Sequence, residues 1–71
     1  MGHSLITIPF FDPNIELDVH TATHGHHIGH TSVRQFAEWV EAPITLQRRD
    51  DNGEYLVSCP STGEFIEGQE I

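Results

Sequence analysis

Histidines crowded into one stretch are the residues of this sequence most able to do chemistry. Five of the six histidines lie within eleven consecutive positions of the 71-residue chain. Neutral imidazole is a common ligand of zinc, nickel and copper. A structural zinc site takes its ligands in tetrahedral geometry. The stretch therefore predicts a metal site, with zinc as the candidate cofactor and with His20, His24, His26, His27 and His30 as ligands.

Two other interpretations of these histidines stay open. Gly25 and Gly29 indicate a flexible loop, so the imidazoles could be solvated side chains with no common role. They could also form a pH-responsive surface, because protonation of all six histidines changes the net charge from -8 to -2. The stretch matches neither the HExxH pattern of metalloproteases nor the paired cysteines of a zinc finger.

Charge is the second distinctive property. Eleven carboxylates face three arginines, and the chain has no lysine, which gives a net charge of -8. Such a body repels nucleic acid and anionic membranes and favours a basic protein surface or a metal cation. We expect a protein partner, contacted through Glu16, Asp18, Trp39, Asp50 and Asp51. Trp39 fits either the rim of the core or an interface anchor.

The sequence does not point to catalysis. It contains no nucleophile elbow, phosphate-binding loop or dinucleotide fingerprint. The single cysteine, Cys59, is expected to be a small buried core residue. A chain this short, with one helix, is not expected to enclose the roughly 300 Å³ that a small-molecule site usually needs. We therefore expect no enzymatic activity from the chain by itself.

Three functional hypotheses follow. The leading one is a small acidic, non-enzymatic binding or regulatory protein that acts like an inhibitor on a larger, basic partner, such as one that handles nucleic acid. The alternative is a metal-binding protein, and the third is an accessory subunit of a multicomponent enzyme. A lone cysteine and the absence of a long apolar run favour a cytoplasmic protein without a membrane partner. A homo-oligomer remains open.

The histidine stretch follows the clearest predicted strand. Residues 15–22 alternate, with Ile15, Leu17, Val19 and Thr21 on one face and Glu16, Asp18, His20 and Ala22 on the other. An earlier apolar run over residues 5–8, ending at Pro9, predicts another strand.

The one predicted helix covers residues 31–42. Ser32 can cap it, and Gln35 completes a capping-box pattern. The apolar stripe consists of Val33, Phe36, Ala37 and Val40. Pro43 ends the helix, because the residue before a proline avoids helical geometry.

A hairpin is predicted next, with residues 44–49 and 55–59 as its strands and Asn52-Gly53 at its turn. Residues 65–66 are expected to form a last short strand, and residues 67–71 a frayed tail.

These elements predict a small single α+β domain spanning residues 1–71, in the order ββαββ(β). The sheet is expected to be mostly antiparallel, with the helix packed across one face. A β-grasp-like arrangement is one topology that fits this order. Residues 23–31 form the His/Gly-rich connecting loop of this scheme.

Overall fold

A computed structural model describes residues 6–8, 14–23 and 28–71 of the chain. Its elements, in chain order, are β1 (Ile6–Ile8), β2 (Glu16–Ala22), β3 (Gly29–Ser32), α1 (Val33–Val40), β4 (Thr45–Arg48), β5 (Glu54–Cys59) and β6 (Glu64–Glu70). The α+β class is confirmed, and the described residues contain the one predicted helix. The additional strand is β3, which lies in the segment expected to be part of the connecting loop at residues 23–31.

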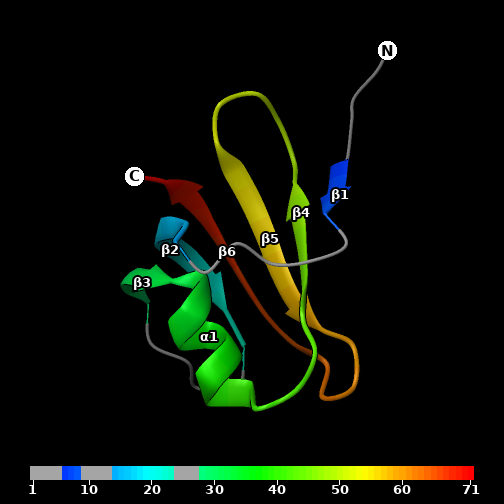
Figure 1. The fold of residues 1–71 in the computed structure, drawn as a ribbon. Coiled ribbons are helices and arrows are strands. Elements are labelled where there is room, and N and C mark those ends of the chain that lie inside the picture. Colours follow the sequence, from blue (N-terminus) through cyan, green and yellow to red (C-terminus); the bar gives the residue numbers. More distant parts are fainter. Residues whose placement is uncertain (1–5, 9–13, 24–27) are drawn as a thin grey trace.

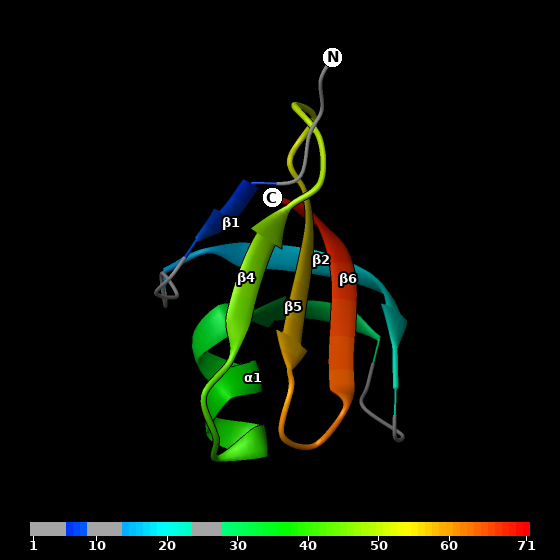
Figure 2. The same cartoon turned by 90° about the vertical axis from the view of Figure 1, so that its right-hand side faces the viewer.

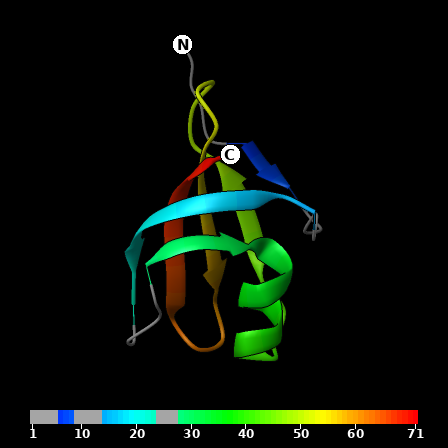
Figure 3. The same ribbon diagram turned by 90° about the vertical axis from the view of Figure 1, so that its left-hand side faces the viewer.

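The described strands form one antiparallel sheet in the order β1-β4-β5-β6-β2-β3. Every strand pairing among residues 6–8, 14–23 and 28–71 is antiparallel, whereas a β-grasp sheet has two central strands that run parallel. Figure 1 shows β4, β5 and β6 side by side as a meander. Strands β2 and β3 cross this meander on the side where α1 lies (Figures 2 and 3).

One face of the meander is turned away from α1 and faces the viewer in Figure 2. We call it the outer face, and the alternation of its strands gives it Thr45, Gln47, Glu54, Leu56, Ser58, Phe65, Glu67 and Gln69.

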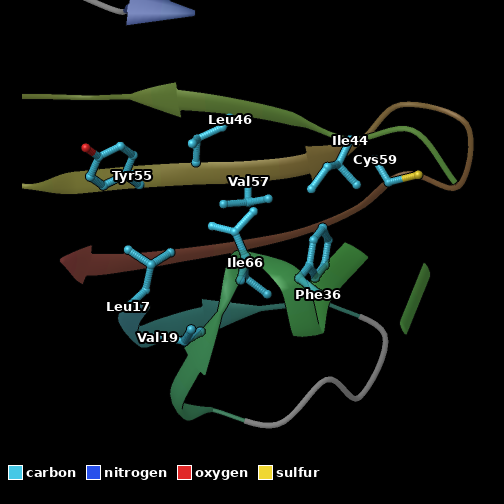
Figure 4. Packing of buried hydrophobic residues seen from close by; sticks show 10 residues of the cluster. Leu17, Val19, Phe36, Ile44, Leu46, Tyr55, Val57, Cys59 and Ile66 are labelled. Carbon is cyan, nitrogen blue, oxygen red and sulfur yellow. The ribbon is translucent and has the colours of Figure 1, made fainter. Parts of the chain in front are cut away.

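The core fills the space between the meander, β2 and α1 (Figure 4). Alternate residues of β5 are buried, as a strand with one face on a core requires. Cys59 is fully inaccessible, which confirms its expected place in the core. The buried cluster comprises Leu17, Val19, Val33, Phe36, Ile44, Leu46, Tyr55, Val57, Cys59 and Ile66.

Helix α1 begins with the predicted capping box. The Gln35 N–H donates to Ser32 Oγ at 3.2 Å, and the Ser32 N–H donates to Gln35 Oε1 at 3.1 Å. The helix is shorter than the predicted residues 31–42, because Thr31 and Ser32 pair with β2 instead. It ends at Val40, where Glu41 takes a left-handed conformation with φ 53° and donates its N–H to the Ala37 carbonyl.

Strand β6 is longer than predicted, and the expectation of a frayed tail at residues 67–71 is wrong. The strand lies between β5 and β2 and pairs with both along its length. The Glu70 N–H donates to the Gly53 carbonyl at 2.7 Å, and the Ile71 N–H donates to the Glu16 carbonyl at 3.0 Å. These partners are distant in sequence, so local pattern alone does not indicate them.

The predicted β4–β5 hairpin is confirmed. The Arg49 N–H donates to the Glu54 carbonyl and closes the loop. The loop is longer than a two-residue Asn-Gly turn: Gly53 has φ 89°, whereas Asn52 has no positive φ. The carboxylate of Asp50 holds the loop by accepting the N–H groups of Asn52 and Glu54.

Candidate protein-binding surface

A bulge in β2 sets which side chains reach the outer face. The register with β6 shifts between Val19 and Thr21, which leaves His20 as the extra residue. After the bulge Thr21 lies opposite Glu67, and Ala22 packs against the core. The two faces predicted for residues 15–22 are therefore correct up to Val19 and reversed for Thr21 and Ala22.

Close approach of β2 and β6 accompanies this bulge. A Cβ on Gly68 would lie 2.7 Å from the Asp18 carbonyl oxygen and 3.0 Å from the Val19 Cα. Only glycine fits between backbones at this distance. Gly68 thus allows the two strands to pair where the outer face turns from the meander onto β2.

His20 connects β2 to β5. Its Nε2 lies 2.8 Å from Glu54 Oε2, although β6 separates the two strands in the sheet. The His20 Nδ1 lies 3.2 Å from Thr21 Oγ1. The imidazole is half exposed and the Glu54 side chain is 22% exposed, so the pair forms part of the accessible surface.

A second histidine–carboxylate contact joins β3 to β2. His30 lies opposite Asp18 in the strand register, and its Nε2 lies 2.8 Å from Glu16 Oε1. Both members of this pair are mostly exposed, so water screens their interaction. Two of the residues expected to contact a partner, Glu16 and Asp18, thus lie beside a histidine on the same strand pair.

The arginines near the meander are engaged locally. Arg49 Nη1 contacts Glu67 Oε2, which joins the end of β4 to β6. Arg48 Nε donates to the Asp50 carbonyl at 3.2 Å. Asp50 and Asp51 are exposed in the β4–β5 loop, as their assignment to a contact surface requires.

An open hollow lies on the outer face along the β5–β6 hairpin, with a volume of about 310 Å³. Cross-strand neighbours line it: Leu56 lies opposite Glu67, and Ser58 lies opposite Phe65. The hollow is open at the surface, so it is not the enclosed cavity that so short a chain was not expected to form. The lining consists of Leu56, Ser58, Cys59, Pro60, Gly63, Glu64, Phe65 and Glu67.

The predicted metal ligands are tested only in part. His24, His26 and His27 lie outside the described residues. Within residues 6–8, 14–23 and 28–71, no group of three or more His, Cys, Asp or Glu side chains is placed to hold a metal ion. His20 and His30 each contact a carboxylate, which is the kind of partner that orients an imidazole ligand. The metal site stays a prediction.

Trp39 projects from the helix rather than from the sheet. Its ring centroid lies 6.1 Å from that of Phe36, and the residue is 44% exposed. Phe36 is fully buried, so the pair spans the boundary between core and surface. This position fits both interpretations of Trp39 given by the sequence.

Hydroxyl groups surround the one thiol. The side chains of Ser61 and Thr62 lower the pKa of Cys59 by hydrogen bonding, against an opposing effect of burial. Its Sγ lies 3.3 Å from Ser61 Oγ. Although Cys59 borders the hollow, the residue is fully inaccessible, so the thiol is not presented to a ligand.

Sequence reasoning missed four residues of this surface: Glu54, Glu67, Leu56 and Phe65. In residues 54–59 the side chains alternate between the two faces of the strand, so Leu56 points to the face away from the buried Tyr55 and Val57. This alternation could have identified Leu56 as an outward-facing apolar residue. Glu67 lies opposite Leu56 only because β6 extends beyond the strand predicted at residues 65–66.

No protein-family model matches the chain, and neither the curated proteins nor the solved structures give a significant match. Among the described residues, no helix has the length and apolar character needed to cross a membrane.

Proposed function

We propose that the protein is a small acidic, non-enzymatic binding or regulatory protein that contacts a basic surface of a larger protein, in the manner of an inhibitor. The single observation that carries this proposal is the outer face. It presents carboxylates around an apolar centre, and the arginine beside it, Arg49, is already engaged by Glu67. Protein interfaces commonly combine an apolar centre with a polar rim.

Charge supports the same partner class. The net charge of -8 gives the protein an extended negative field, which accelerates association with a positive surface. A partner that handles nucleic acid fits because its phosphate-binding groove is cationic. We place this action in the cytoplasm as part of the proposal, since the lone Cys59 suits a reducing compartment.

The experiment tests whether binding depends on the outer face itself or only on the net charge of the protein. Two double variants have the same net charge of -6: Asp18→Asn with Glu67→Gln near the outer face, and Glu38→Gln with Glu41→Gln on and beside α1. The probe is a fluorescent peptide of nine arginines, titrated against each variant by anisotropy. We expect wild type to bind, and the first variant to lose several-fold more affinity than the second.

Salt dependence completes the test. Raising the salt concentration from about 0.05 M to about 0.5 M should weaken wild-type binding steeply, because exposed charge pairs are screened. An affinity that stays flat over this range contradicts the proposal. Equal losses in the two variants contradict the assignment to the outer face.

A further inference from the structure

We propose that the hollow between β5 and β6 is a docking site for a large apolar side chain carried by an arginine- or lysine-rich segment of a partner protein. This inference rests on the proposed function, whose binding surface it names. It begins from the hollow on the outer face, about 310 Å³ in volume.

The floor of the hollow is apolar. Leu56 and Phe65 lie on neighbouring strands and are half-buried, with Pro60 exposed at the hairpin turn. Leu56 lies diagonally from Phe65, because their opposite partners in the register are Glu67 and Ser58. An apolar side chain seated here would bury this surface together with its own, and each square ångström of apolar area removed from water contributes about 25 cal/mol.

The charged residues that line the hollow favour a cationic ligand. Its lining residues include two carboxylates, Glu64 and Glu67, and no cationic residue. Arg49 contacts Oε2 of Glu67, and a carboxylate accepts several hydrogen bonds, so a second cation can share this group. Glu54 adds a further carboxylate at the neighbouring outward position of β5, where His20 holds it.

Charge also decides between a partner protein and a second copy of this chain. Two molecules that each carry a net charge of -8 repel one another, whereas a basic segment is attracted. Interface hot spots are enriched in tryptophan, tyrosine and arginine, which combine an apolar body with a polar or cationic group. An aromatic side chain flanked by basic residues therefore fits both the apolar floor of the hollow and the carboxylates that line it.

Two peptides of equal charge test the site. Each contains four arginines, and the central position is tryptophan in one peptide and glycine in the other. We expect wild type to bind the tryptophan peptide about tenfold more tightly than the glycine peptide, as a seated aromatic anchor provides. Leu56→Thr and Phe65→Thr should each abolish this preference and leave binding of the glycine peptide unchanged.

The matched control is Ile71→Thr, the same kind of change at a residue that is 71% exposed and outside the hollow. It should keep the tenfold preference. Circular dichroism melts identify any variant that has failed to fold, and backbone NMR shifts of wild type on adding the tryptophan peptide give a readout without mutation. The largest shifts should fall on residues 56–67.

Each remaining outcome overturns a different statement. If both peptides bind wild type equally, the docking site is wrong while the acidic binding function stands. If neither peptide binds at low salt, the proposed function itself is wrong. If Trp39→Gln abolishes the preference for the tryptophan peptide and Phe65→Thr does not, the binding site lies on α1 and not in the hollow. A dimer of wild type that Phe65→Thr dissociates assigns the hollow to a second copy.

Discussion

The imidazole of His20 on β2 contacts the carboxylate of Glu54 on β5 across the intervening strand β6, with 2.8 Å between Nε2 and Oε2. The two residues are 34 positions apart in the sequence. The bulge that leaves His20 unpaired turns it toward the outer face, and Gly68 allows β2 and β6 to approach closely at the same place. The contact between His20 and Glu54 therefore depends on how β2, β6 and β5 pair with one another.

The coupling between His20 and Glu54 should be small. His20 is half exposed, and exposed ion pairs typically contribute about 1 kcal/mol or less. A double-mutant cycle with His20→Ala and Glu54→Gln, measured by urea unfolding near neutral pH, should give a coupling energy within this range. A coupling of several kcal/mol would show that water is excluded from the pair, contrary to its exposure.

Gly68→Ala should destabilise the fold strongly. The new Cβ would lie 2.7 Å from the Asp18 carbonyl oxygen, so β2 and β6 would have to separate. Forced backbone shifts of this kind cost about 1–3 kcal/mol, occasionally more. The matched control is Gly63→Ala, which meets no atom within 4 Å but has φ 79°. Chemical denaturation should show a larger loss for Gly68→Ala, and equal losses would contradict the role assigned to strand contact.

Zinc should raise the melting temperature if the histidine stretch binds metal. Metal bound only to the folded state adds about 2.7 kcal/mol at a concentration 100 times the Kd. For a domain of this size we expect a shift of about 10 °C or more. Protein prepared without nickel chromatography is heated with zinc and with a chelator.

The control for the zinc experiment is a histidine of the same chain that lies outside the cluster. Simultaneous replacement of His24, His26 and His30 by alanine should abolish the zinc effect, whereas His3→Ala, outside the cluster, should keep it. A wild-type protein whose melting temperature ignores both zinc and chelator eliminates the metal-binding hypothesis and leaves the two other interpretations of the histidines.

Stability should depend on the ionisation of Cys59. Hydrogen bonds from Ser61 and Thr62 lower the pKa of this thiol in the folded protein. Between the lowered pKa and that of the unfolded chain, the unfolded state binds a proton that the folded state does not, so stability rises with pH. The contribution is complete above the unfolded pKa and is lost as pH falls through the folded pKa.

The measurement compares wild type with Cys59→Ala by urea unfolding from about pH 7 to about pH 10, the range in which thiols titrate. The difference in unfolding free energy should grow in favour of wild type as pH rises. Ser61→Ala, which removes the largest cause of the shift, should reduce this growth. A difference that stays constant with pH would show that the thiol titrates alike in both states.

The sequence by itself determined the features that depend on neighbours in the chain. Alternation predicted the strand at residues 15–22 as far as Val19, and Ser32 with Gln35 predicted the start of α1. The acidic charge excess and the crowding of histidines are also properties of the sequence alone. Each of these signals acts over a few residues or over the composition, so no tertiary contact is needed to recognise it.

Only the tertiary structure decided the surface that carries the proposed function. Glu67, Gly68 and Glu70 belong to β6 because β5 and β2 supply its hydrogen-bonding partners from both sides. The bulge at His20 and the hollow beside Leu56 then follow from how those strands pair. Strand pairing joins residues distant in sequence and depends on packing against them, and for that reason local propensity could neither lengthen β6 nor bring His20 to Glu54.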